Sequence, residues 1–267
     1  MEKRKIILIT GSASGIGLAA VERMLSLGHR VIGVDIKPTE RLGCDSYLVD
    51  ITDANAILPL YDRLVAEGVT LDVIIHAAGV HAMCSLVEGD LAKMKRLIDV
   101  NLVGAMNVNR LLYPLLSKDG RIVIVTSEIA PLDPMPFNGL YSISKTALDC
   151  YAQSLRQELN LLGQSVVTVR PGAVETPLAR GSLDATEALA NNTVLYKRQA
   201  GRFLGITKRF MGTPIIPERI AEIIERAALA RRPRLVYSKN RSLGLLLLNM
   251  LPIRLQCGVI KLLLNKK

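Results

Sequence analysis

A tyrosine and a lysine placed four residues apart could together move a proton to or from a bound molecule. They are Tyr141 and Lys145, in the stretch LYSISK. In a helix both side chains would lie on one face, where the ammonium could stabilise the phenolate. An exposed pair without function has the same spacing. Ser127 favours the functional interpretation, because it ends an apolar strand fourteen residues before Tyr141, so that the strand end and the helix start can converge.

The first apolar run leads into a glycine-rich turn suited to a phosphate group. The run KIILI is followed by Thr10–Gly17 and then by a helical pattern. Glycines permit a tight turn and close approach of the backbone to a diphosphate, while a helix N-terminus offers N–H groups to the anion. An ordinary strand-to-helix turn is the alternative. The candidate cofactor-binding residues here are Gly11, Ser12, Ser14, Gly15, Ile16 and Gly17.

The second apolar run ends in a carboxylate that would select between two dinucleotides. Asp35 closes RVIGVD, eighteen residues beyond Gly17. A carboxylate at this point can accept hydrogen bonds from both hydroxyls of an adenosine ribose and would repel a 2′-phosphate, which favours NAD over NADP. A simple turn aspartate is the alternative, and the nearby Lys37 weakens the argument.

The order of the elements predicts the fold. Seven short apolar runs (KIILI, RVIGV, SYLV, DVIIH, RIVIVT, SVVTV and RLVY) alternate with stretches of helical period, including residues 18–27, 94–116 and 141–162. Continuously apolar strands between helices are typical of a parallel sheet covered on both faces. We therefore expect a doubly wound α/β Rossmann fold of about seven mostly parallel strands, with ligands beyond the carboxyl ends of the strands.

Composition narrows the class of protein. A chain of 267 residues without a linker-like stretch predicts a single domain. The four cysteines are scattered and no His/Cys cluster has metal-ligand spacing, so we expect reduced thiols, a cytoplasmic location and no metal. The first apolar run is too short for a signal peptide. The net charge of +10 is carried by dispersed residues with few aromatics, which argues against nucleic-acid binding.

With these residues in view, the chain resembles the short-chain dehydrogenase/reductase family from about Lys5 to Tyr237. The resemblance rests on motifs in the family's order: the turn Thr10–Gly17; Asp50 with Ile51; His76-Ala77-Ala78-Gly79; Asn101 in NLVG; Ser127; Tyr141-x-x-x-Lys145; and Pro171–Thr176. Relatives usually carry asparagines where His76 and Ala77 stand. We expect His76 to be a hydrogen-bonded structural group, and we do not assign His81, in the next loop, to the site.

The resemblance implies a catalytic set of Asn101, Ser127, Tyr141 and Lys145. In the family the serine holds the substrate oxygen, the tyrosine exchanges the proton, the lysine also contacts the nicotinamide ribose, and the asparagine links the lysine to solvent through water. It also implies cofactor contacts from Asp50, Ile51, Ala77, Ala78, Gly79, Tyr141, Lys145, Pro171, Gly172, Val174 and Thr176. Lys145 and the positive nicotinamide ring together are expected to bring the pKa of Tyr141 from about 10 towards 7.

Two segments lie outside the expected core of residues 1–175. Residues 176–216 are a long excursion that includes Leu195, Tyr196, Phe203, Leu204, Phe210 and Met211, and we expect a substrate lid. Residues 241–267 are rich in apolar side chains, but only twelve uncharged residues lie between Arg241 and Arg254, and Asn249 and Pro252 interrupt them, so this run cannot span a bilayer. There Leu255, Val259, Leu262 and Leu263 form a helical stripe, with Arg254, Lys261 and Asn265 on other sides.

Three interpretations of this C-terminal stripe stay open. It could pack on its own domain or a sister subunit, cap a lipophilic substrate cleft, or rest peripherally on a membrane surface. Packing within protein is the expected arrangement for such a stripe. The resemblance to hydroxysteroid and retinol dehydrogenase-type members of the family suggests a lipophilic substrate, and family members commonly form homodimers or homotetramers through the helix of the Tyr-Lys motif.

The sequence therefore predicts an NAD(H)-dependent oxidoreductase that interconverts a secondary alcohol and a ketone on a lipophilic, steroid-, retinoid- or lipid-like molecule. A reductase of 3-oxoacyl or polyketide-type substrates, which would use NADPH, is the enzymatic alternative. A non-catalytic NAD-binding sensor or interaction protein is the alternative of another class.

Overall fold

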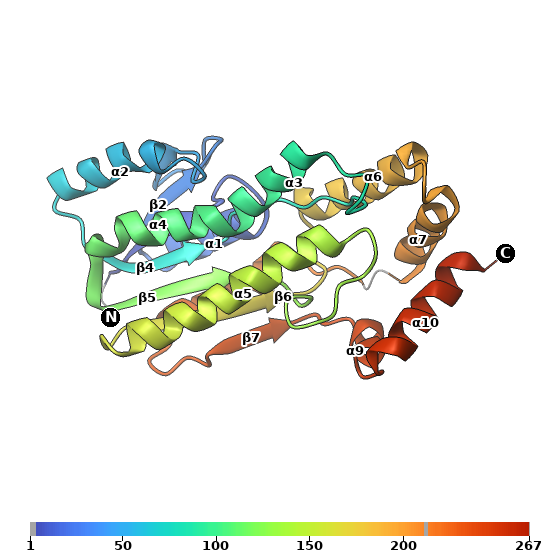
Figure 1. The fold of residues 1–267 in the computed structure, drawn as a ribbon. Coiled ribbons are helices and arrows are strands. Elements are labelled where there is room, and N and C mark those ends of the chain that lie inside the picture. Colours follow the sequence, from blue (N-terminus) through green and yellow to red (C-terminus); the bar gives the residue numbers. More distant parts are fainter. Residues whose placement is uncertain (1–3, 211–212, 267) are drawn as a thin grey trace.

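Seven parallel strands form one sheet in the computed structural model, which describes residues 4–210 and 213–266 (Figure 1). Their order across the sheet is β3-β2-β1-β4-β5-β6-β7. The bounds are β1 Ile6–Thr10, β2 Arg30–Asp35, β3 Cys44–Leu48, β4 Leu71–His76, β5 Leu116–Val125, β6 Ser165–Pro171 and β7 Val236–Lys239. The predicted doubly wound Rossmann fold is confirmed. The chain changes direction across the sheet between β1 and β4, so the loops after these strands meet where ligands bind in such folds.

Helices cover both faces of the sheet, as the apolar strands require. The helices α1 (Gly15–Ser26) and α8 (Pro217–Leu229) pack on one face, and α2 (Ala54–Ala66), α4 (Gly104–Leu112) and α5 (Gly139–Asn160) pack on the other (Figure 1). Alternate residues of β1 divide between the two layers: Leu8 faces α2, α4 and α5, whereas Ile7 and Ile9 face α1 and α8. Both layers are continuous hydrophobic cores.

The long helix expected over residues 94–116 is interrupted. It consists of α3 (Leu91–Ile98), a π-helical turn (Asp99–Val103), α4 and a 3₁₀ turn (Tyr113–Leu115). Asn101 lies within the π turn, where its side chain bonds to groups outside the helix. Short π turns of this kind frequently occur at functional sites. Periodicity along the sequence cannot detect one extra residue in a turn.

The predicted lid is a pair of helices, α6 (Pro177–Asn192) and α7 (Lys197–Phe210). A bridge between Val174 and Ile215 joins the two ends of the excursion. Of the lid residues named from the sequence, Phe203 is buried, Leu195 is 65% exposed, and Met211 lies outside the described residues.

The C-terminal extension forms α9 (Leu243–Asn249) and α10 (Ile253–Asn265) beside α7 (Figure 1). The side of α10 that packs on the domain carries Gln256, Ile260 and Leu264. The expectation that the sequence-predicted stripe packs on its own domain is wrong in this structure, because Leu255, Val259, Leu262 and Leu263 are between 37% and 69% exposed. Polar contacts of Gln256 and the fit of Leu264 orient the helix, and periodicity does not reveal either.

Candidate active site

The turn after β1 forms a cradle that only glycines fit. Gly11 and Gly15 have φ angles of +70° and +54°, and a Cβ on Gly17 would lie 1.9 Å from the carbonyl oxygen of Gly11. Ser14, the residue before α1, makes no capping hydrogen bond with its side chain. The first N–H groups of α1 are thus not capped by that residue and can bind an anion. These features fit the diphosphate of a dinucleotide.

Carboxylates close β2 and follow β3, as the sequence predicted. Asp35 accepts hydrogen bonds from the backbone N–H groups of Ala13, at 3.0 Å, and Lys37, at 3.1 Å, which hold it beside the glycine turn. Asp50 accepts from Thr52 and pairs with Arg96 at 2.9 Å, and its pKa is lowered by these partners although burial opposes them. These contacts hold both side chains in place, and the lowered pKa of Asp50 keeps that carboxyl ionised at neutral pH.

The loop after β4 lies against the glycine turn. A Cβ on Gly11 would lie 2.6 Å from the backbone of Ala78, and Ala77 donates its N–H to the carbonyl of Thr10 at 3.2 Å. A Cβ on Gly79 would lie 3.3 Å from both Asn101 Oδ1 and Lys145 Nζ. The predicted cofactor residues of β1 and β4 thus come together, and Gly79 connects them to the Tyr-Lys region.

Tyr141, Ser127 and Lys145 meet where β5 ends and α5 begins. Ser127 acts on the phenol of Tyr141, where it opposes the rise in pKa that burial causes, and Lys145 Nζ lies 5.9 Å from the centre of the tyrosine ring. Lys145 is buried and donates to the carbonyl of Val125 at 3.4 Å. The helix is held to the strand end because Thr146 donates to the carbonyl of Ala130 at 2.8 Å. The convergence expected from the sequence is present.

Burial dominates the protonation of this pair. It raises the pKa of Tyr141 to about 12, against the opposing hydrogen bond from Ser127, and it lowers the pKa of Lys145 to about 8. The sequence-based expectation of a lowered tyrosine pKa included the charge of a nicotinamide ring, whereas the protein groups alone act in the opposite direction. At neutral pH they leave the phenol protonated and most of the lysine cationic.

Asn101 is a buried connector between the β4 loop and α5. Its amide nitrogen donates to the carbonyl of Val80 at 2.9 Å and to Ser144 Oγ at 3.0 Å, while its oxygen accepts from the N–H of Val80 at 2.8 Å. Ser144 in turn donates to the carbonyl of Tyr141 at 2.7 Å. These contacts fix the first turn of α5. The role of linking Lys145 to solvent through water stays a prediction.

The segment Pro171–Thr176 returns to the glycine turn. A Cβ on Gly172 would lie 1.8 Å from the carbonyl oxygen of Asn240, and a Cβ on Gly15 would lie 3.1 Å from the methyl group of Thr176. The bridge between Val174 and Ile215 is formed by the N–H of Glu175 and the carbonyl of Ala173, which both bond to Ile215. The N–H of Val174 takes no part in that bridge. Thr176 also caps α6 by accepting from Ala179 at 3.2 Å.

His81 lies against Tyr141 but was not among the predicted site residues. The ring of His81 lies 4.4 Å from that of Tyr141, centre to centre, and its Nε2 bonds to Asn138 at 3.1 Å. Its buried Nδ1 has no hydrogen-bond partner within the described chain. Burial lowers the pKa of His81 to about 4, so the ring is neutral at pH 7. No sequence motif marks this contact, although His81 lies five residues beyond β4.

A second histidine, His76, is a hydrogen-bonded structural group, as expected. His76 Nε2 bonds to Asn109 Oδ1 at 2.7 Å inside the core, and burial lowers its pKa to about 4.

Glu128, next to Ser127, accepts from the N–H of Ser242 at 2.5 Å. Burial raises the pKa of Glu128, against that bond and the charge of Arg241. This carboxylate therefore ties the site to the first residues of the C-terminal extension.

An apolar pocket of about 290 Å³ lies near the start of α5, where a Cβ on Gly139 would lie 3.4 Å from the wall residue Leu86. Its walls come from the β4 loop (Leu86 and Val87), from Phe137, and from Tyr196, Lys261 and Leu264 of the lid and α10. Phe137 immediately precedes Asn138, the partner of His81, and has a φ angle of +65°, which is strained for this residue type. It is held there by edge-on contacts with Tyr196 and Phe203, both at 5.5 Å.

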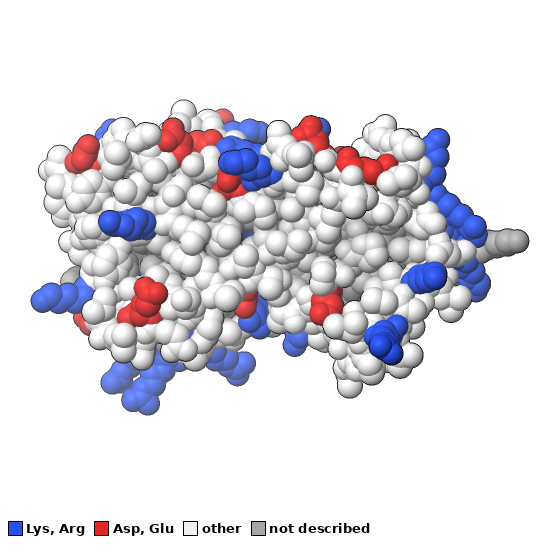
Figure 2. Space-filling view, in the orientation of Figure 1, with Lys and Arg blue, Asp and Glu red and all other residues white. Residues whose placement is uncertain are grey.

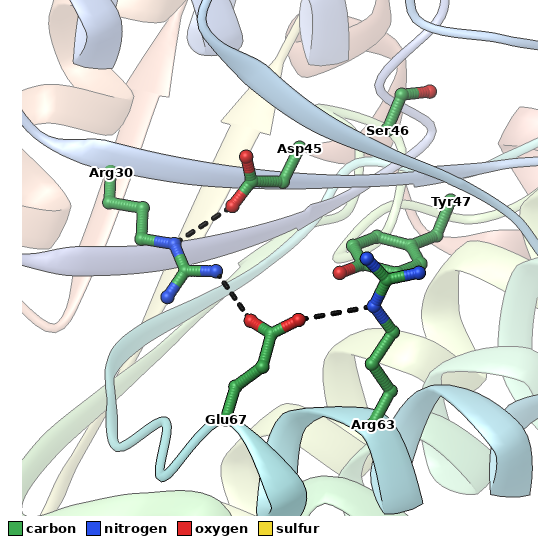
Figure 3. Close-up of a pocket in the computed structure, with 6 residues that line it drawn as sticks. All are labelled: Arg30, Asp45, Ser46, Tyr47, Arg63 and Glu67. Carbon is green, nitrogen blue, oxygen red and sulfur yellow. Dashed lines mark hydrogen bonds and ion pairs between the residues drawn. The ribbon is translucent and has the colours of Figure 1, made fainter.

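A second hollow, of about 340 Å³, is polar and distant from these residues in the fold, at the start of β2 (Figure 3). Figure 3 shows that its charged groups pair with one another: Arg30 with Asp45 and Glu67, both at 2.8 Å, and Arg63 with Glu67 at 3.1 Å. Arg63 also lies over the ring of Tyr47. The hollow lies away from the carboxyl ends of the strands, and we interpret it as a structural ion-pair cluster.

Comparison with known proteins agrees with this geometry. The family model described as short chain dehydrogenase matches residues 5–187. The 3-ketodihydrosphingosine reductase of Bacteroides thetaiotaomicron is 30% identical over 174 residues, which cover 64% of this chain and 65% of that protein. The NADPH-dependent 1-acyldihydroxyacetone phosphate reductase of Schizosaccharomyces pombe is 30% identical over 208 residues, which cover 73% of this chain and 69% of that protein.

Solved structures share the fold. A 4-hydroxyisoleucine dehydrogenase complexed with NADH has a TM-score of 0.69 and 24% identity, covering 88% of this chain and 96% of that one. A short chain dehydrogenase from Burkholderia cenocepacia in complex with NADP has a TM-score of 0.72 and 19% identity, covering 99% of both chains. Proteins of this fold thus hold either dinucleotide.

Proposed function

This chain belongs to the short-chain dehydrogenase family and is an oxidoreductase, and we propose that it interconverts a secondary alcohol and a ketone with NAD(H). The observation that carries the proposal is the convergence of Tyr141 and Ser127 beside the buried Lys145. We assign proton transfer to Tyr141, positioning of the substrate oxygen to Ser127, and support of the first turn of α5 to Asn101.

A bound dinucleotide supplies or accepts the hydride at the substrate carbon. In the direction of reduction, Tyr141 donates its proton to the carbonyl oxygen, which becomes the hydroxyl of the alcohol. The raised pKa of Tyr141 suits this step, because the phenol carries its proton at neutral pH. In the direction of oxidation the same oxygen takes the proton back, and the positive charge of Lys145 favours the phenolate that must form first.

The dinucleotide would lie along the predicted cofactor residues. The turn Gly11–Gly17 would hold the diphosphate, and Asp35 the adenosine ribose. We propose NAD rather than NADP because the fixed carboxylate of Asp35 would meet a 2′-phosphate with repulsion. Asp50 and Ile51 would flank the adenine, and Lys145 and Pro171–Thr176 the nicotinamide end.

A lipophilic substrate is supported by the apolar pocket near the start of α5, the helix that carries Tyr141. Its volume of about 290 Å³ suits an alkyl chain or a fused ring system better than a small alcohol. Two relatives are named for ketone-bearing lipids, 3-ketodihydrosphingosine and 1-acyldihydroxyacetone phosphate. The second is named as NADPH-dependent, which favours testing a reductase of 3-oxo lipids with NADPH as the alternative.

One assay tests the proposal. The full chain is mixed with hydroxysteroids, retinol, a long-chain 3-keto amino alcohol, an acetoacetyl thioester or a short secondary alcohol or ketone, each with NAD(H) and NADP(H), and nicotinamide absorbance is followed. We expect turnover with NAD(H) and a lipophilic member. Preference for NADPH with the thioester would replace the proposal by the 3-oxoacyl alternative, and turnover of short compounds alone would refute the lipophilic substrate.

A pocket variant sharpens the assay. Val87→Asn places an amide on a wall residue that is already 70% exposed, so folding should be retained. It should lower kcat/KM for the long substrate about tenfold and leave the short substrate unchanged, since only the long one would contact the wall.

We also propose a cytoplasmic homodimer or homotetramer formed through α5. Ile143, on the first turns of α5, is 47% exposed and is available for contact with a second copy. All four cysteines are unpaired, as is usual for thiols in a reducing cytoplasm. Static light scattering of the assayed sample measures the assembly, and a monomer at assay concentration would refute it.

A further inference from the structure

The outward side of α9 and α10 is covered with large apolar side chains. We call this surface the C-terminal apolar face. Its residues are each between 37% and 79% exposed and are Leu243, Leu247, Met250, Leu251, Ile253, Leu255, Val259, Leu262 and Leu263. So many large apolar side chains exposed on two consecutive helices are uncommon on a water-soluble monomer and indicate an interaction site.

Polar contacts fix the orientation that exposes this face. On the inner side of α10, Gln256 donates to Asp133 at 3.2 Å, while Asn249 at the end of α9 accepts from the N–H of Asp133 at 2.7 Å. Arg198 of α7 donates to the carbonyl of Asn265 at 2.7 Å. The inner side therefore belongs to the domain. Turning the stripe inward would break these bonds.

Two segments of the sequence, one containing α7 and one containing α9 and α10, carry its excess of positive charge. Residues 188–217 and 241–267 contain ten lysines and arginines and no aspartate or glutamate. The whole chain has 34 basic and 24 acidic residues, so the 24 basic residues elsewhere balance the 24 acidic ones, and these two segments account for the full net charge of +10. Figure 2 shows Lys and Arg at the end of the molecule where α7 and α10 lie in Figure 1.

We propose that the C-terminal apolar face docks peripherally on an anionic membrane surface. Apolar side chains would enter the boundary between headgroups and acyl chains, and the surrounding lysines and arginines would contact anionic headgroups. A second copy of the chain fits less well, because two such faces would bring two basic segments together. Within the described residues no helix is long and apolar enough to cross a bilayer, so the attachment is interfacial.

The position of α10 gives this docking a consequence. Its inner side contributes Lys261 and Leu264 to the apolar pocket, while its outer side carries the face. One helix thus separates the pocket from the membrane plane. If the substrate is the lipophilic one proposed above, it can reach the pocket from the bilayer; the docking itself is independent of the activity.

Vesicle flotation of the full chain tests the docking. The vesicles are phosphatidylcholine alone and an equimolar mixture of phosphatidylcholine and phosphatidylglycerol, at low and high salt. The double variant Leu255→Glu/Leu262→Glu changes two side chains that are 59% and 69% exposed, so it should fold. The matched control is Leu42→Glu/Leu161→Glu, whose leucines are at least as exposed but lie elsewhere. A charge variant, Arg254→Gln/Lys266→Gln, changes two exposed side chains outside the pocket and tests the headgroup contact.

We expect the wild type and the control to float with the mixed vesicles and much less with phosphatidylcholine. Flotation should decrease as the salt concentration rises, and it should be lost in the Glu double variant. In the Gln variant the membrane affinity should fall about fivefold for each charge removed. Matching melting temperatures establish folding. Absent flotation, or flotation that the Glu double variant retains, overturns the proposal. If the wild type does not float but forms dimers that the Glu double variant alone dissociates, the face would instead bind a second copy of the chain.

Discussion

At the scale of single residues, the proposed chemistry depends on one hydroxyl. Tyr141→Phe removes the proton carrier but keeps the ring that packs against His81. We expect kcat to fall by about 10²- to 10⁴-fold, the usual contribution of a general acid or base, with dinucleotide binding and melting temperature retained. The measurement is steady-state turnover together with a fluorescence titration of the dinucleotide.

A tyrosine on the same helix provides the control for this variant. Tyr151 accepts a hydrogen bond from Asn109 at 3.0 Å and lies outside the proposed site. Tyr151→Phe should keep turnover, apart from a modest loss of stability. Unchanged turnover in Tyr141→Phe would instead support the non-catalytic alternative, in which the chain binds the dinucleotide without using it.

At the scale of elements, the turn between β1 and α1 should be the least tolerant of a methyl group. A Cβ on Gly17 would lie 1.9 Å from the carbonyl oxygen of Gly11, so Gly17→Ala must separate helix and turn. We expect dinucleotide affinity to fall at least tenfold and the free energy of unfolding to fall by about 1–3 kcal/mol. Urea unfolding and the fluorescence titration measure the two effects.

The matched control for Gly17→Ala is Gly181→Ala. Gly181 lies within α6 and has no atom within 4 Å of its would-be Cβ. Because alanine is the better helix former, this change should be neutral or should stabilise by up to about 1 kcal/mol. Equal effects of the two substitutions would contradict the close approach described for the turn.

At the scale of the whole molecule, stability should fall in mild acid. Burial lowers the pKa of His76 from 6.5 to about 4. Between pH 6.5 and about pH 4 this imidazole is therefore protonated in the unfolded chain and neutral in the folded chain. The free energy of unfolding therefore decreases as pH falls through this window, by about 2 kcal/mol from this residue between pH 7 and 5. His81 acts in the same direction.

Urea unfolding at the two pH values, with wild type and His76→Asn, measures this contribution. Asparagine can still bond to Asn109 but does not titrate, so the loss between pH 7 and 5 should be smaller by about 2 kcal/mol in the variant. Each protein is compared with itself at the two pH values, so any loss of stability that the substitution causes equally at both pH values cancels. Equal losses in the two proteins would contradict the burial of a neutral imidazole.

The sequence by itself determined the fold and most of the candidate site. Its apolar runs are the seven strands, because a strand buried on both faces must be apolar along its length. Gly11, Gly17 and Asp35 could be assigned because the turn demands those residue types, and the Tyr141–Lys145 pair because helical spacing puts them on one face. Each of these features depends on residues that are neighbours in the chain.

Only the tertiary structure decided features made by residues far apart in the sequence. The ring of His81 packs at a tilt against that of Tyr141, and Glu128 accepts a hydrogen bond from Ser242, 114 residues away. The stripe of Leu255 and Leu262 faces outward because Gln256 and Leu264 fit the domain better on the opposite side of α10. Periodicity identifies an apolar side of a helix, but the surface that this side meets is set by packing and hydrogen bonds elsewhere in the chain.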